Sequence, residues 1–181
     1  MRINPKHRNK YPWYLKPFFY HQKKKYGAIL EPGLIWGRIP KLFLAVATLY
    51  GVIDRKKSLI APELRSLITV RVSQINWCDF CVDINSATLI KRSGSQEKVQ
   101  ALAAWQTAAV FSVKEKTALA YTEAVTISGQ HPDDKLFSQL REHFNDNEIV
   151  ELTALIAFQN MSSKFNSALD IAPQGFCEIS H

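Results

Sequence analysis

Apolar residues recur every three to four positions along most of the chain from residue 38 onward, the spacing that buries one face of a helix. Pro40 opens a mostly apolar stretch that runs to Ile53. Further on, Pro62 and Glu63 have the form of a helix start, with proline in the first turn and an acid at the positive end of the helix dipole. Alternating strand patterns are nearly absent. We therefore expect an all-α domain of six to eight helices.

Several helix ends are marked by capping residues. Ser112–Glu115 and Asn145–Glu148 each have the form of a capping box, in which the first and last side chains bond each other's backbone amides. A helix from near Cys78 to Arg92 is expected to stop at Gly94, because glycine accepts the left-handed conformation that ends many helices.

Residues 1–32 form a basic, aromatic N-terminal arm, and residues 33–181 form the helical domain, with no linker inside it. The arm mixes aromatic residues with Pro5, Pro12 and Pro17, and prolines this dense exclude a long helix. We expect the arm to pack on the body or on a neighbouring subunit. The alternative is a basic patch for an anionic membrane or a nucleic acid.

The positive charge belongs to the arm. The chain has a net charge of +7, and residues 1–30 hold eight of the 23 basic residues and no acidic one. The rest carries 15 basic against 16 acidic residues and is close to neutral. A nucleic-acid-binding body would need its own basic surface, so we expect no nucleic-acid partner.

Membrane and export signals do not stand out. The longest apolar run, Leu42 to Ile53, has 12 residues, about 18 Å as a helix against a hydrocarbon core of about 30 Å. We expect no membrane span, and the N-terminus lacks the shape of a signal peptide. Three cysteines are too few for a secreted disulfide framework. These observations favour a cytoplasmic protein.

Cys78 and Cys81 are the residues most typical of a chemical function. Two cysteines three positions apart on one exposed helix face can close a disulfide or both stand reduced, and a helix N-terminus stabilises the reactive thiolate. Zinc is an alternative, since Cys177 and His181 would complete a Cys3His set, but structural zinc sites usually pair two such motifs, so we expect no metal. A second alternative is that the two thiols only pack in the core.

The stretch from Ala61 through Gly94 resembles the core helical pair of the carboxymuconolactone decarboxylase family, in its alkylhydroperoxidase D-like, peroxidase-related branch. The matching runs are Pro62–Ile68, Arg71–Asn76 and the Cys78–Cys81 motif. The resemblance covers about residues 33–175. The segment Glu148–Thr153, together with Gln159, Asn160 and Lys164–Asn166, resembles the family's closing helix.

The resemblance implies a helical homo-oligomer, a trimer or hexamer, with no cofactor. It also implies that Cys81 attacks a hydroperoxide and Cys78 resolves the product into a disulfide, which a thiol reductant or a disulfide partner protein then reduces. Lactone decarboxylation, which the family name suggests, is disfavoured because members with that chemistry generally lack the cysteine motif.

The proton relay that the resemblance implies is altered in this chain. The family places His four residues after the second cysteine, where Asn85 stands, and Glu twelve residues before the first, where Ser66 stands. Neither replacement serves as a base near neutral pH. We expect Glu63, one turn from Ser66, to act as a substitute base or as a helix-terminal residue, and Asn85 to orient a water.

Trp77 and Phe80 flank the thiols and are expected to form pocket walls or core. Among the histidines, His21 stands out, because the arm could fold across the active site of a neighbouring subunit. We expect a thiol-dependent peroxidase or disulfide oxidoreductase acting through Cys78 and Cys81, with a weakened relay. The alternative is a non-enzymatic oligomeric module that senses redox state or binds a partner through the basic arm.

Overall fold

The computed structural model describes residues 1–177, and within them the chain forms nine α-helices, three short 3-10 helices and no strand. The α-helices are α1 (Lys16–Tyr26), α2 (Glu31–Trp36), α3 (Pro40–Ile53), α4 (Pro62–Ile75), α5 (Asp79–Ser93), α6 (Glu97–Ala101), α7 (Val113–Thr126), α8 (Asp134–Arg141) and α9 (Asp146–Ala168). The 3-10 helices are η1 (Arg8–Lys10), η2 (Trp13–Leu15) and η3 (Leu102–Ala104). The all-α expectation is confirmed. The total exceeds six to eight because α1 and α2 form before residue 38, where the sequence pattern predicted no helix.

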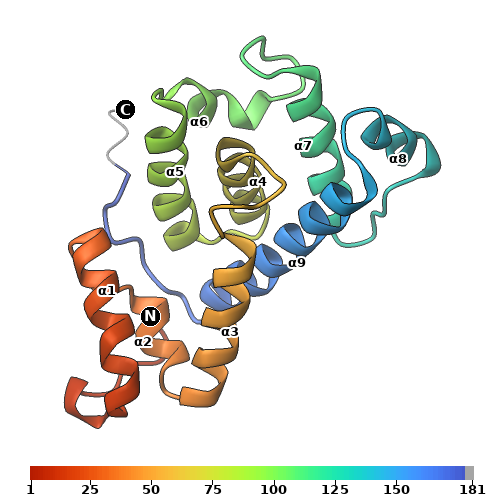
Figure 1. Ribbon diagram of the computed structural model, residues 1–181. Helices are drawn as coiled ribbons and strands as arrows, with labels where there is room; N and C mark the ends of the chain where they lie inside the picture. The colour runs from red at the N-terminus through yellow and green to blue at the C-terminus, as the bar shows by residue number, and fades with distance from the viewer. Residues whose placement is uncertain (178–181) are drawn as a thin grey trace.

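Helix α4 lies at the centre of the body and packs against α5, α7 and α9 (Figure 1). Its residues Leu67, Ile68 and Val70 are fully buried. Its polar residues Arg65, Ser66 and Ser73 are buried as well, so the neighbouring helices cover α4 on most of its sides. Tight α4–α5 packing fixes the connection between these two helices, which carries Cys78.

The predicted helix ends are confirmed. Ser112 caps α7 and Asn145 caps α9, each in a capping box with the glutamate three residues later. Helix α5 ends at Gly94, whose φ of 74° is left-handed. These local signals set the length of the helices that surround the cysteine motif.

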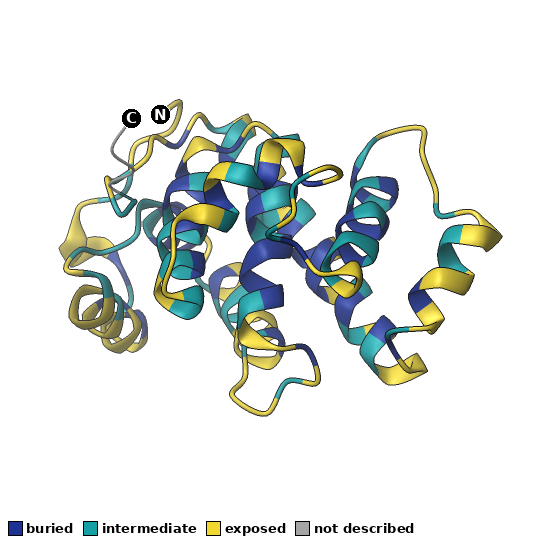
Figure 2. Cartoon of the chain, turned by 90° about the horizontal axis from the view of Figure 1, so that it is seen from above, coloured by how far each residue is buried: buried dark blue, intermediate teal, exposed yellow. Residues whose placement is uncertain are grey.

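The arm packs on its own chain. Tyr11, Leu15 and Phe19 are buried against Trp36 and Phe43. Helix α1 forms despite the nearby prolines because Pro17 lies in its first turn, where no backbone donor is needed. In Figure 2, α1 at one end of the molecule and α8 at the other are largely exposed, whereas most of the buried residues lie between them. Within residues 1–177, every helix is too short or too polar to cross a bilayer.

The segment after α9 ties the arm to α5. The Gln174 side chain accepts a hydrogen bond from the Glu31 amide and donates one to the Ile29 carbonyl. The backbone amide of Gln174 donates to the Asp83 carboxylate on α5. One residue therefore holds together the loop before α2, helix α5 and the C-terminal segment.

Candidate functional site

Cys78 is the N-cap residue of α5. The amide of Cys81 donates to Cys78 Sγ at 3.2 Å, so the sulfur takes the place that a capping oxygen usually fills. Trp77, just before it, has a φ of 54°, and its side chain is 85% exposed. Trp77 does not line the cavity described below, so the expected pocket wall is not formed by this residue. Its left-handed backbone turns the side chain toward solvent.

Cys78 and Cys81 form a disulfide, with 5.2 Å between their Cα atoms. Their residues are only 1% and 3% exposed, so the expectation of an exposed helix face is wrong. Burial does not seal the pair, however. Cys81 lines a cavity of about 300 Å³, whereas Cys78 lies behind it and is not part of the lining. A small molecule in the cavity would meet Cys81 first.

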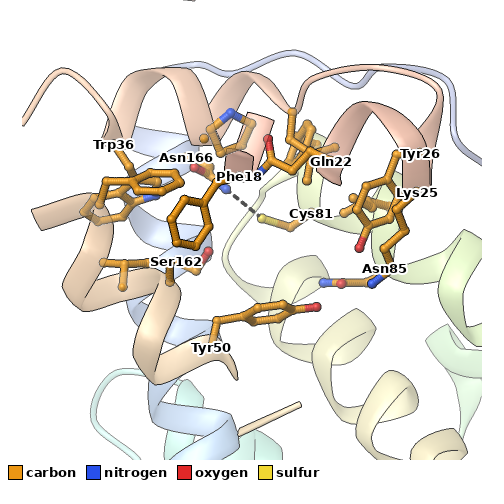
Figure 3. A pocket seen from close by; sticks show the side chains of 18 of the residues that line it. Phe18, Gln22, Lys25, Tyr26, Trp36, Tyr50, Cys81, Asn85, Ser162 and Asn166 are labelled. Carbon is orange, nitrogen blue, oxygen red and sulfur yellow. Dashed lines mark hydrogen bonds between the residues drawn. The ribbon is translucent and has the colours of Figure 1, made fainter. Parts of the chain in front are cut away.

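The cavity is walled mainly by aromatic side chains from the arm and the body. Its aromatic lining residues are Phe18, Tyr26, Trp36, Phe43, Tyr50, Phe80 and Phe158. Figure 3 shows Cys81 among Phe18, Gln22, Tyr26 and Tyr50, with Trp36 to one side. Phe80 thus lies where the sequence predicted it, and α1 supplies one wall. A site of this kind suits a compact apolar ligand with few polar groups.

Asn166 on α9 is the polar residue in contact with the Cys81 sulfur. Its Nδ2 group donates to Cys81 Sγ at 3.2 Å, drawn as the dashed line in Figure 3. Asn166 is 2% exposed, and its Oδ1 has no partner within residues 1–177. A donor held against the sulfur stabilises negative charge there, and so favours the thiolate after reduction. This role was not predicted from the sequence.

Asn85 lines the same cavity as Cys81, one turn further along α5. Its Nδ2 group donates to Ser73 Oγ at 3.2 Å, and Gln159 Nε2 donates to the same oxygen at 3.0 Å. Ser73 is fully buried and donates onward to the Thr69 carbonyl. The network fixes two amide side chains at the cavity wall. The sequence did contain a signal for these polar contacts. Gln159 and Asn166 are polar residues two turns apart on a largely apolar, buried face of α9.

Glu63 is not brought to the cysteine pair. Its carboxylate accepts from Lys98 Nζ at 2.7 Å, and Glu63 does not line the Cys81 cavity. Lys98 also pairs with Glu115. Burial lowers the pKa of Lys98, but its hydrogen bonds to Glu115 and Glu63 outweigh this, and the pKa lies above its ordinary value. Glu63 therefore belongs to an ion-pair cluster that ties the start of α4 to α6 and α7.

Ser66 and Asn85 stand where the resemblance expects a Glu and a His. Both line a second cavity of about 60 Å³, which shares Tyr26, Tyr50 and Asn85 with the wall of the first. Arg92 donates to Ser66 Oγ at 2.9 Å. Ser66 is therefore bonded to an arginine, and neither short side chain supplies the carboxylate or imidazole that the resemblance expects.

Asp83 faces away from the cavity and binds the C-terminal segment. Its carboxylate accepts the amides of Gln174 and Cys177. Burial raises the pKa of the Cys177 thiol, and Asp83 adds to this effect. His181 lies outside the described residues. Within residues 1–177, no three His, Cys, Asp or Glu side chains are gathered closely enough to hold a metal.

His21 lines the cavity of its own chain, on the face that α1 contributes. The expected place, across the active site of a neighbouring subunit, is not where this histidine lies within the single chain. It lies on the wall that also holds Phe18, Gln22 and Lys25. The cavity thus has an imidazole as well as an amide network at its edge.

Fold and site together define a class of helical proteins with a cysteine pair at the start of a helix, opening on an internal cavity. The chain belongs to the carboxymuconolactone decarboxylase family, whose sequence model matches residues 40–124. It shares its fold with a solved structure that has an alkylhydroperoxidase AhpD core.

Three similar proteins illustrate the relationship. The uncharacterized protein YnjA of Escherichia coli (strain K12) is 42% identical over 171 residues, which cover 94% of each chain. An uncharacterized peroxidase-related protein from Ralstonia eutropha JMP134, with an alkylhydroperoxidase AhpD core, has a TM-score of 0.88 at 20% identity, covering 97% of this chain and 93% of that one. A cysteine-to-alanine variant of the debrominase Bmp8, in complex with 2,3,4-tribromopyrrole, has a TM-score of 0.85 at 26% identity, covering 97% and 93%.

Proposed function

We propose that the protein is a thiol-dependent oxidoreductase that reduces small apolar hydroperoxides at Cys81 and is returned to its dithiol form by a thiol reductant or a disulfide partner protein. One observation carries the proposal: Cys81 lines an aromatic cavity and is bonded to Cys78, which the cavity does not reach. This order matches attack by Cys81 and resolution by Cys78. Both cysteines are built into the start of one helix, so the disulfide can form without rearrangement of the core.

The reaction needs two thiols and one hydroperoxide. The Cys81 thiolate attacks the terminal peroxide oxygen, the O–O bond breaks, and the departing oxygen takes a proton to leave as an alcohol. Cys81 is then a sulfenic acid. The Cys78 thiol attacks its sulfur, the S–O bond breaks, and water leaves as the disulfide forms. An external dithiol restores both cysteines and is itself oxidised.

The proton for the departing oxygen needs a donor, because Asn85 and Ser66 do not supply one. His21 is our candidate, since it is the one histidine among residues 1–177 that lines the cavity. Asn85 holds a fixed amide at the wall and orients water or the substrate. Phe80 contributes to the apolar wall against which the organic part of the substrate packs.

Counting thiols tests this proposal. The fully reduced protein is treated with one equivalent of cumene hydroperoxide, denatured and titrated for free thiols. We expect the count to fall from three to one, leaving Cys177. Cys81→Ser should keep both of its remaining thiols, whereas Cys78→Ser should carry a sulfenic acid that a dimedone label reveals by mass. Cys177→Ser is the matched control and should still lose two thiols. Persistence of all three thiols in the unmodified protein would contradict the proposal.

Reductive dehalogenation of an aromatic ring is a second candidate. Seven aromatic side chains line the cavity, and the debrominase Bmp8 is a structural neighbour. In that reaction a thiolate takes the halogen, the ring carbon takes a proton, and the second thiol displaces halide to form the disulfide. Incubating the reduced protein with a brominated pyrrole and measuring bromide by ion chromatography distinguishes the two activities. Release of one bromide per disulfide, with no consumption of hydroperoxide, would favour this candidate.

Helix α3 supports a homo-oligomer, which we propose to be a trimer or hexamer. Leu42, Leu49 and Val52 on this helix are 40%, 44% and 55% exposed. Apolar residues gathered on one surface helix favour burial against another protein surface. Light scattering should give a mass three or six times 20.6 kDa, and Leu49→Glu should lower it.

The non-enzymatic, partner-binding alternative is less well supported, because aromatic residues of the arm pack on the body and wall the cavity.

A further inference from the structure

The smaller cavity contains a buried arginine whose charge is incompletely matched. Arg65 is 4% exposed, and its Nε has no partner within residues 1–177. Its remaining nitrogens reach the Arg55 carbonyl at 2.9 Å and the Asp54 carboxylate at 3.4 Å. A buried guanidinium normally has all of its donors satisfied, so Arg65, which lines this cavity, keeps one donor that no residue uses.

Arg92 lines the same cavity and competes for the same counter-charge. Its guanidinium donates to both carboxylate oxygens of Asp54, at 3.0 and 3.3 Å. Two arginines thus share one aspartate. Glu151, the other acid near Arg65, is paired with Arg55 and bound to Ser58. Burial lowers the pKa of Arg65, and Arg92 lowers it further, although Asp54 acts in the opposite direction. The cluster carries an excess positive charge that an anion would neutralise.

The two cavities lie side by side. Six residues line both, namely Tyr26, Tyr50, Ile84, Asn85, Phe158 and Gln159. The larger cavity is lined by Cys81, Lys25 and seven aromatic side chains. The smaller one is lined by Arg65, Arg92 and Asp54. The two arginines therefore line one part of the combined site, and Cys81 lines the other.

We propose that Arg65 and Arg92 form a subsite for a carboxylate on the substrate, which places the apolar remainder of that substrate in the aromatic cavity beside Cys81. Guanidinium groups suit carboxylates because their donors match both oxygens. The subsite specifies the substrate class as a compact aromatic or aliphatic acid that carries the reducible group at its far end. The subsite adds a substrate class to the proposed function. It rests on that function for the identity of the reducible group.

Binding to the disulfide form tests the subsite without relying on turnover. The probe is 4-isopropylbenzoate, compared by calorimetry with its neutral amide, and we expect the acid to bind at least about tenfold more tightly. Arg92→Gln should remove that preference, whereas Asp54→Asn should strengthen binding of the acid several-fold, because it deletes the competing carboxylate. Both variants break the same Arg92–Asp54 ion pair, so a loss of stability alone cannot produce opposite effects. Equal binding of acid and amide, or weakening in both variants, would overturn the proposal.

Two further experiments distinguish binding of a substrate carboxylate from binding of any small anion, and the subsite from the peroxidase function. Acetate is a free small anion without apolar surface, and binding as tight as that of 4-isopropylbenzoate would mean that the cavity takes a free ion, which would also overturn the proposal. The second experiment compares cumene hydroperoxide with its para-carboxylate in the thiol count. Consumption of both at equal rates would contradict the subsite while leaving the peroxidase function standing. Selective binding of the acid with no consumption of either would leave the subsite standing and contradict the peroxidase function.

Discussion

The side-chain amide of Asn166 on α9 donates to the sulfur of Cys81 on α5 at 3.2 Å, across 85 positions of sequence. Both residues are almost fully buried, and both line the larger cavity. The closing helix therefore acts directly on the cysteine that faces the cavity. This contact connects the long-range packing of the fold to the reactivity of a single sulfur atom.

Asn166→Ala should lower the fraction of Cys81 present as thiolate at neutral pH by about tenfold, since a hydrogen bond to a charged group contributes roughly 1.5–3 kcal/mol. Asn166→Asp should lower it further, because a carboxylate repels the thiolate. The measurement is the rate of iodoacetamide labelling of Cys81 against pH, in the reduced Cys78→Ser, Cys177→Ser background. Asn160→Ala, one of the polar positions on α9 that does not line the cavity, is the control. Equal labelling profiles for Asn166→Ala and its parent would contradict the role of this amide.

His21→Gln should slow reduction of cumene hydroperoxide by about tenfold, because general acid catalysis by a positioned side chain contributes on the order of a hundredfold or more and water replaces part of it. Stopped-flow rates at pH 7 provide the measurement. His131→Gln, in the exposed loop before α8, should match the unmodified protein. An unchanged rate in His21→Gln would assign the proton to water.

Replacing Ser66 with Glu and Asn85 with His together should raise kcat/KM for a neutral hydroperoxide by about tenfold at pH 7, since a base and a proton carrier would then stand beside Cys81. Both residues line the second cavity, where the Arg92 guanidinium that now bonds Ser66 would pair with the new carboxylate. Glu63→Gln is the matched control and should leave the rate unchanged, because its carboxylate is held by Lys98 outside the cavity. A slower reaction in Glu63→Gln would restore Glu63 as the working base.

Glu115 should make the fold sensitive to acid. Burial raises its pKa, but hydrogen bonds from Lys98 and Ser112 outweigh this, so the pKa lies below the ordinary value of 4.5. A carboxylate with a depressed pKa contributes stability that is fully present when the pH is above its pKa in the unfolded state. This stability is lost as the pH falls through its pKa in the folded state. Glu115→Gln should therefore reduce the free energy of unfolding by about 1 kcal/mol at pH 7, and by less near pH 3.

Urea unfolding at the two pH values measures this effect. Glu97→Gln, an exposed first-turn acid of α6, should change stability little at either pH. A loss in Glu115→Gln that is the same at pH 7 and pH 3 would show that the ion pair with Lys98 is not its cause.

The helices and their ends could be predicted because their signals are local. The capping boxes at Ser112 and Asn145 and the stop at Gly94 each depend on residues within one turn. Helix α1 could not be predicted in this way, because it forms where Tyr11, Leu15 and Phe19 find partners in distant residues. Tertiary burial overrides a weak local preference at that point.

The candidate site was predictable only in part, for the same reason. Cys78, Cys81, Asn85 and Phe80 come from one short segment, and the structure brings the last three to the cavity. Glu63 and Trp77 are near in sequence but are turned elsewhere, Glu63 by Lys98 and Trp77 by its left-handed backbone. Asn166 and α1 contribute to the site through contacts between residues far apart in sequence. The spacing of residues along the chain does not predict such contacts.

Gln174 makes the cavity wall depend on the last stretch of the chain. Because this residue bonds the backbone of Ile29 and Glu31 and also reaches Asp83 on α5, the loop behind the α1 wall is fastened from the opposite terminus. Phe19 holds α1 itself against Trp36 and Phe43, so the bonds of Gln174 act on the loop that joins this wall to α2. A change at this glutamine, which contacts no reacting atom, would therefore be transmitted to the backbone beside the cavity.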